Sequence, residues 1–212
     1  MAKSKFSIAV LISGSGTTLR NLIEYDQSGK LDAKISLAIC SNPKATGTQY
    51  AEQQGIEVVI VDHRSVKEPD FSDTIFDSCR AAGVDMIVMA GFLRKLTIPD
   101  SYQNRVINIH PSLIPAFSGK GFYGSKVHQA AIDFGCKVSG CTVHLVDNQY
   151  DHGPIVAQRV VEVSAEDTSA VLAARVFEQE CILYPQIINQ FANDQVKIEG
   201  RRVTVLKQKT TV

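Results

Sequence analysis

The residues best suited to chemistry lie at 106–115, where Asn108 and His110 alternate with β-branched residues. This alternation predicts a short buried strand, on which Asn108 and His110 share one face. Pro111 should end the strand, because proline has no N–H to donate and has a fixed φ. Strand exits of open α/β sheets are where such folds bind ligands. The alternative is a satisfied core Asn beside a surface His with no catalytic role.

Two further residues could join this pair. Asp151 lies in a polar turn, 147–154, and His144 lies in the predicted strand 140–146. A nearby carboxylate raises the pKa of an imidazole and orients its ring. A protonated His and an Asn amide are both donors that can stabilise an oxyanion. The combination predicts acyl transfer or hydrolysis without a covalent enzyme intermediate, although each residue alone fits an ordinary turn or strand.

Sequence motifs of other catalytic classes are missing. The chain has no G-x-S-x-G, no H-E-x-x-H and no Cys beside a general base, and its five histidines show no metal-ligand spacing. Covalent serine or cysteine catalysis and zinc hydrolysis are therefore unsupported. We expect no metal.

A second candidate site follows the predicted strand 6–12, where Ser13–Thr18 precedes a helical pattern that runs to about residue 28. A helix N-terminus offers free N–H groups and a positive dipole end to an anion. Glycines allow the backbone to approach that anion closely. The loop matches neither the dinucleotide nor the Walker fingerprint. We expect it to bind a phosphate; the alternative is a helix simply capped by Ser or Thr.

Strands alternate with helices over the first half of the chain, which predicts βαβ units and a parallel sheet. The later residues 143–163 predict an antiparallel hairpin, and 140–146 a strand with one wetter face. The fold class we predict is α/β: a Rossmann-like, mainly parallel twisted sheet flanked by helices, with an antiparallel hairpin at the C-terminal part of the sheet. We expect one domain over 1–212, with its core at about 6–191.

The last long helix should open at Glu166–Thr168 and be kinked or interrupted by Pro185. Short strands should lie within 196–206, and 207–212 reads as a frayed tail. The predicted buried stripe of this helix consists of Val171, Leu172, Val176, Cys181, Ile182, Ile187 and Ile188.

Composition excludes several classes of partner. The 22 basic and 22 acidic residues give zero formal net charge, so no bulk field attracts nucleic acid or an anionic membrane. The five cysteines form no C-x-x-C pair, which favours a reducing compartment. The apolar run 8–12 is too short for a signal peptide or a membrane span. We therefore expect a cytoplasmic protein without a nucleic-acid or membrane partner. For its assembly we expect a monomer or a homodimer.

Six segments resemble the folate-dependent formyltransferases, in that family's order: 11–17, 40–42, 90–94, 108–115, 140–144 and 151–155. Asn-x-His-Pro-Ser-Leu with a later Asp-x-Gly-Pro is a specific signature. The Ser-Gly-Ser-Gly loop narrows the resemblance to the branch of phosphoribosylglycinamide formyltransferases. It implies transfer of a formyl group from the cosubstrate 10-formyltetrahydrofolate to the amine of 5'-phosphoribosylglycinamide (GAR), in purine biosynthesis.

The resemblance also implies residue roles. Asn108, His110 and Asp151 would be the catalytic trio, with Asp151 managing protons. The GAR-binding residues would be Gly16, Thr17, Thr18 and Glu180, although Thr18 stands where Asn is common. The folate pocket would be lined by Leu93, Arg94, Lys95 and Leu96, with Asn108 and Asp147. The resemblance gives no role to the residues of the loop 116–126. That loop has three glycines and no periodicity, which by themselves predict a mobile loop that acts as a lid near the site.

Two other functions remain open. A formyltetrahydrofolate deformylase would use water in place of the amine, but it usually carries an extra N-terminal domain, for which no room precedes Phe6. A non-catalytic module would bind a nucleotide without turnover. A formyltransferase acting on methionyl-tRNA is disfavoured by the zero net charge and by the lack of an RNA-binding domain after Phe191.

Overall fold

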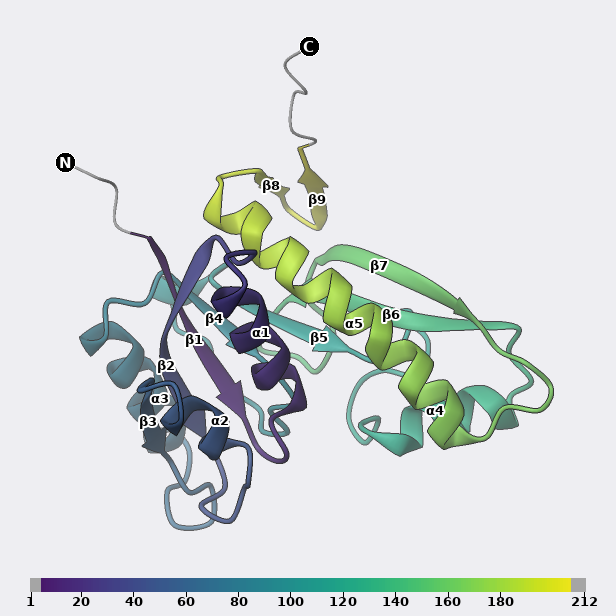
Figure 1. Cartoon of the computed structure of the whole chain (residues 1–212), viewed down its shortest axis with the longest axis horizontal. Coiled ribbons are helices and arrows are strands. Elements are labelled where there is room, and N and C mark those ends of the chain that lie inside the picture. Colours follow the sequence, from purple (N-terminus) through teal and green to yellow (C-terminus); the bar gives the residue numbers. More distant parts are fainter. Residues whose placement is uncertain (1–4, 207–212) are drawn as a thin grey trace. The chain divides into compact units, whose positions relative to one another are not determined.

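The computed structural model describes residues 5–206, so the predicted tail 207–212 lies outside the described residues. Figure 1 shows the elements. In chain order they are β1 (Phe6–Ile12), α1 (Thr17–Gln27), β2 (Ala33–Cys40), α2 (Thr48–Glu52), β3 (Glu57–Ile60), α3 (Asp70–Ala81), β4 (Met86–Met89), η1 (Asp100–Tyr102), β5 (Val106–His110), α4 (Ser125–Asp133), β6 (Val138–Leu145), β7 (Ile155–Glu162), α5 (Ser169–Ala192), β8 (Val196–Glu199) and β9 (Arg202–Val205).

The chain forms two compact units, and the boundary between them falls within β5. The first contains the residues up to Ile109 together with Val146–Asn148. The second contains His110–Leu145 and the chain from Gln149 onward. The expectation of one domain stays a prediction.

The first unit is built on parallel strands, in the order β3-β2-β1-β4-β5. Its central strand β1 is fully buried from Ile8 to Ile12, as expected for a parallel strand covered on both faces. Helix α3 packs Ile75 and Phe76 into the same core as Leu11 and Ile39 of the sheet. This apolar core fixes the strand ends from which the loops of the unit begin.

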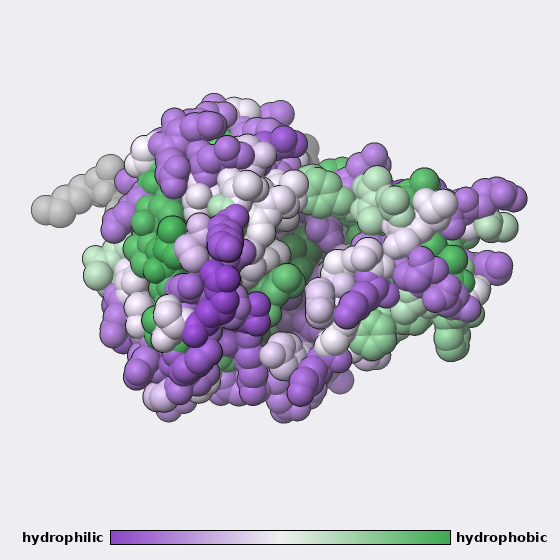
Figure 2. Space-filling view, turned by 90° about the horizontal axis from the view of Figure 1, so that it is seen from below, coloured by the Kyte–Doolittle hydropathy of each residue, from purple (hydrophilic) through white to green (hydrophobic). Residues whose placement is uncertain are grey.

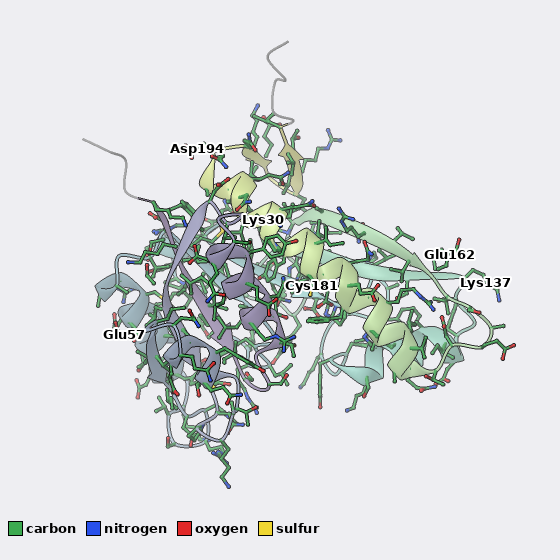
Figure 3. The ribbon with its side chains drawn as sticks, in the orientation of Figure 1. Lys30, Glu57, Lys137, Glu162, Cys181 and Asp194 are labelled. Carbon is green, nitrogen blue, oxygen red and sulfur yellow. The ribbon has the colours of Figure 1, made fainter. Side chains whose placement is uncertain are left out.

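The second unit is built on the antiparallel pair β6 and β7, in register from Val138–Glu162 to His144–Ile155. Gly140 of β6 must be glycine, because a Cβ there would lie 1.9 Å from the carbonyl oxygen of Arg159 on β7. Figure 3 shows Lys137 and Glu162 at the same end of this hairpin. Helix α5 packs on both strands. The predicted fold class, a mainly parallel α/β sheet with an antiparallel hairpin, is confirmed.

The prediction that the strand 140–146 has one wetter face was wrong, because β6 is buried on both faces. Thr142 and His144 are 0% and 2% exposed. Thr142 Oγ1 donates to the carbonyl of Ser112 (2.6 Å) and accepts from the N–H of Ile114 (3.1 Å). These contacts replace water for the hydroxyl, so the polar residue can be buried.

Helix α5 is continuous from Ser169 to Ala192, so Pro185 does not interrupt it (Figure 1). Pro185 is itself buried, and packing of the buried face outweighs the one missing N–H. The predicted stripe was partly wrong: Val171 and Ile182 are exposed and Cys181 is only half-buried. The buried residues follow helical spacing more closely; they are Leu172, Val176, Glu180, Leu183, Tyr184, Pro185, Ile187 and Ile188.

The face shown in Figure 2 is mixed, with hydrophilic side chains interspersed with smaller hydrophobic patches. Between residues 5 and 206, no helix is both long and apolar enough to cross a membrane.

Candidate active site

Asp151 lies between two buried imidazoles in the second unit. One carboxylate oxygen is 3.6 Å from Nδ1 of His110, and the other is 3.7 Å from Nε2 of His144. The side chains of the two histidines are only 5% and 2% exposed, against 14% for Asp151. The sequence placed these residues on separate elements, and the fold brings them together. The cluster is therefore a set of three titratable groups in a largely dry environment.

The outer nitrogens of both rings carry hydrogen. Nε2 of His110 is 3.0 Å from the carbonyl of Phe117, and Nδ1 of His144 is 2.8 Å from the carbonyl of Leu145. A carbonyl oxygen can only accept, so each of these nitrogens must donate. In a neutral ring the inner nitrogen then turns a lone pair toward Asp151. A protonated ring carries hydrogen on both nitrogens, so its inner N–H would point toward the Asp151 carboxylate.

The loop after β5 holds both members of the His110–Asp151 pair. The N–H of Gly119 donates to Oδ2 of Asp151 at 2.8 Å, while the carbonyl of Phe117 accepts from His110. Asp151 has a φ of 49°, a left-handed conformation that Asp adopts more readily than most residues. The turn thus directs its carboxylate toward the loop. The predicted loop 116–126 contains no helix or strand before α4, and its mobility stays a prediction.

Asn108 lies two residues before His110 on β5, paired in register with Met89 of β4. It is half-buried. Alternation along the strand turns its side chain to the same face as that of His110. Pro111 follows the last strand residue, as predicted.

Glu180 is a buried carboxyl on α5, only 9% exposed. Loss of solvent raises its pKa from an ordinary 4.5 to about 7. Burial is the only cause of this shift, and no hydrogen bond to the Glu180 carboxyl group is found among residues 5–206. Burial, and then the charge of Glu180, raise the pKa of the Cys141 thiol to about 12. A buried carboxyl without a donor is suited to bind a polar or cationic ligand group.

The start of α1 in the first unit has the features of an anion site. Gly16 precedes the helix with a φ of 68°, and no side chain caps the helix, so the Ser/Thr-capped alternative was wrong. A Cβ on Gly16 would lie 2.7 Å from the Cα of Gly47, whose N–H donates to the carbonyl of Gly14. Thr17 is exposed, whereas Thr18 is buried and offers mainly its backbone.

The loop after β4 separates into buried and exposed residues. Leu93, Arg94 and Lys95 are exposed, but the side chain of Leu96 belongs to the core, so only its backbone is free to face a ligand. The N–H of Leu93 donates to Oγ of Ser13, at 3.0 Å, which ties this loop to the one after β1. Asp147 belongs to the short segment 146–148 of the same unit.

Sequence reasoning missed the backbone partners of the site, Phe117, Gly119 and Leu145. Any residue supplies a carbonyl and almost any an N–H, so no residue type signals such a role. Within the part of the chain that the structure describes, there is no group of three or more His, Cys, Asp or Glu that could hold a metal ion.

The α/β fold and the cluster of His110, His144 and Asp151 were compared with known proteins to find the class to which the chain belongs. The formyl transferase family profile matches residues 6–188. The chain therefore belongs to the formyl transferase family, and it is an enzyme of that class.

Comparison with individual proteins narrows the similarity within this family. The phosphoribosylglycinamide formyltransferase of Haemophilus influenzae is 35% identical over 195 residues, which are 91% of this chain and 90% of that protein. The chloroplastic phosphoribosylglycinamide formyltransferase of Vigna unguiculata is 37% identical over 89% of this chain, which spans 62% of that protein. The crystal structure of glycinamide ribonucleotide transformylase 1 from Symbiobacterium toebii has a TM-score of 0.90 and 34% identity, covering 97% of this chain and 96% of that one.

Proposed function

We propose that this enzyme transfers the formyl group of 10-formyltetrahydrofolate to the primary amine of GAR, in purine biosynthesis. The contact of Asp151 with His110, at 3.6 Å, is the observation that carries the proposal. It supplies a carboxylate to move protons and an imidazole to hold developing charge. The Haemophilus relative, covered over 90% of its length, supports the choice of substrate.

In the proposed reaction the amine attacks the formyl carbon, and a tetrahedral intermediate forms. Protonated His110 and the amide of Asn108 donate to the oxyanion. The bond from the formyl carbon to the folate nitrogen then breaks. Asp151, directly or through water, moves a proton from the amine to that leaving nitrogen. Formyl-GAR and tetrahydrofolate are the products, and neither a metal nor a covalent enzyme intermediate is needed.

The hydrogen bonds of His110 determine which nitrogen acts. Nδ1 faces Asp151, so Nε2–H is the donor left for the oxyanion. That N–H now donates to the carbonyl of Phe117. Substrate must therefore replace the Phe117 carbonyl, and the loop 116–126 must shift as the active site fills. This is the lid role expected of the loop.

The remaining assignments concern binding. Gly16, Thr17 and Thr18 hold the GAR phosphate through N–H groups at the start of α1, which no side chain caps. Glu180 accepts a hydrogen bond from GAR. Leu93, Arg94, Lys95 and the backbone of Leu96, with Asp147 and Asn108, line the folate pocket.

The test is formyl transfer with and without GAR. Purified protein should convert 10-formyltetrahydrofolate to tetrahydrofolate only when GAR is present, and mass spectrometry should find formyl-GAR. An equal rate without GAR, with release of formate, would establish the deformylase reaction instead. That reaction has support of its own, since a formyltetrahydrofolate deformylase from Pseudomonas syringae matches with a TM-score of 0.85 and 25% identity. GAR binding without turnover would indicate a nucleotide-binding module.

The cell compartment and the assembly belong to the proposal too. Five free cysteines, Cys40 and Cys79 among the buried ones, support a reducing compartment such as the cytoplasm. The proposed partners are the two small-molecule substrates, and the enzyme acts as a monomer or a homodimer.

A further inference from the structure

The hairpin of β8 and β9 lies beyond residues 6–188, which the family profile matches. It nevertheless contacts the turn that carries Asp151. Arg201, at the tip of the hairpin, donates from Nη2 to the carbonyl of His152 at 2.8 Å. His152 is the residue after Asp151. The hairpin therefore reaches the backbone of the proposed catalytic turn through one cationic side chain.

The backbone of this hairpin is held in place by its own strand pairing and by packing on β7. It follows the end of α5, where Figure 3 labels Asp194. Its strands pair from Val196–Val205 to Glu199–Arg202, and the N–H of Leu206 donates to the carbonyl of Gln195. Strand β9 also packs on β7, which begins directly after the catalytic turn. The backbone that carries Arg201 is thus fixed at both ends.

The turn needs such a support, because the orientation of Asp151 depends on a left-handed backbone. Gly119 holds the carboxylate from one side, by a single N–H. Arg201 holds the backbone of the next residue, by a charge-assisted bond that is stronger than a neutral one. Rotation of the turn would alter both Asp151–imidazole distances together.

We propose that Arg201 is a positioning residue for formyl transfer, which fixes the turn of Asp151 through the carbonyl of His152. This inference rests on the proposed function, since it assumes that Asp151 takes part in the reaction. Arg201 does not touch the reacting atoms. Its removal should lower kcat and leave substrate binding largely intact.

The experiment compares Arg201→Ala and Arg201→Lys with Arg202→Ala in the full chain. Arg202 is the adjacent exposed arginine of the same hairpin, so the control removes the same charge. Arg201→Ala should lower kcat about tenfold, the effect of one such hydrogen bond, with KM for both substrates within about twofold. Arg201→Lys should recover part of the rate, and Arg202→Ala should match the wild type.

A second readout separates positioning from stability. Loss of Arg201 should shift the pH–rate profile and the NMR titrations of His110 and His144, because their distances to Asp151 change. Thermal melts of all variants identify loss of folded protein. Unchanged kcat and titrations in Arg201→Ala, or equal changes in Arg202→Ala, would overturn the inference. So would a rate loss explained by the unfolded fraction, with unchanged titrations.

The failure of this inference can be distinguished from failure of the proposed function. Wild-type protein without GAR-dependent formyl transfer would refute the function itself. Active wild type with an unaffected Arg201→Ala variant would refute only the role of Arg201.

Discussion

The two regions proposed to bind and convert substrate are built from different materials. The start of α1 uses backbone: Gly16, a left-handed φ and helix N–H groups without a side-chain cap. The cluster around Asp151 uses ionisable side chains. Those of His110, Asp151 and His144 are each oriented by a hydrogen bond to a backbone group. A phosphate remains charged throughout, and fixed dipoles suffice to hold it. A reacting carbonyl gains charge and exchanges protons, which requires groups that can change their protonation.

This difference predicts that the two regions fail in different kinetic constants. Changes at Asp151 should act on kcat, and changes at Gly16 on the KM for GAR.

The largest effect is expected for Asp151→Asn. Asn cannot accept a proton or stabilise a charged imidazole, so kcat should fall by about 10²- to 10⁴-fold. GAR binding, measured by calorimetry, should stay close to that of the wild type, because the start of α1 is unchanged. If Asp151→Asn instead bound GAR tenfold more weakly with near-normal kcat, the expected division between a catalytic and a binding region would be wrong.

The next effect concerns Glu180, a titrating group whose raised pKa should be visible in stability. The folded pKa of about 7 exceeds the ordinary 4.5, so ionisation disfavours folding as the pH rises through that range. At pH 8 this pKa difference lowers the free energy of unfolding by on the order of 3 kcal/mol, at 1.36 kcal/mol per pKa unit. Glu180→Gln should therefore unfold at higher denaturant concentration than the wild type at pH 8. At pH 4.5 the two should be nearly equal.

The same substitution tests the binding role. Glu180→Gln should weaken GAR binding at pH 8 although the protein is more stable. Stability that differs by the same amount at both pH values would refute the raised pKa. Undiminished GAR binding would remove Glu180 from the substrate site.

The smallest effect is expected for Gly16→Ala. The new Cβ would lie 2.7 Å from the backbone of Gly47, at a φ of 68°, so the loop must shift. The KM for GAR should rise about tenfold and kcat should change little, since about 1–2 kcal/mol of backbone strain falls on the binding loop. Gly14→Ala is the matched control, because its Cβ meets nothing within 4 Å. Equal effects of the two variants would argue against a built phosphate site.

Much of the fold could be predicted because its signals are local. Ile8–Ile12 is a continuous apolar run, and β1 was found there. Pro111 marked where β5 ends. Pattern reasoning failed where burial depends on distant partners. Thr142 and His144 look like surface residues of an alternating strand, but other segments supply polar groups to both: the carbonyl of Ser112 to Thr142 and the carboxylate of Asp151 to His144.

The site shows the same division. Asn108 and His110 could be paired from the sequence, since their spacing places them on one strand face. Their catalytic roles, and those of Asp151 and the binding residues, stay predictions. The carbonyl of Phe117, the N–H of Gly119 and the guanidinium of Arg201 carried no signal, because their importance comes from position alone.

The sequence by itself determined the strands, the helices, the glycine loop and the residue types available for chemistry, because these follow from short-range periodicity and backbone preference. Only the tertiary structure decided that Asp151 lies between His110 and His144, which nitrogens carry hydrogen, and that Glu180 is buried. Those properties depend on which distant groups the folded chain brings within a few ångströms, and such distances set the hydrogen bonds and the orientation of every group in the site.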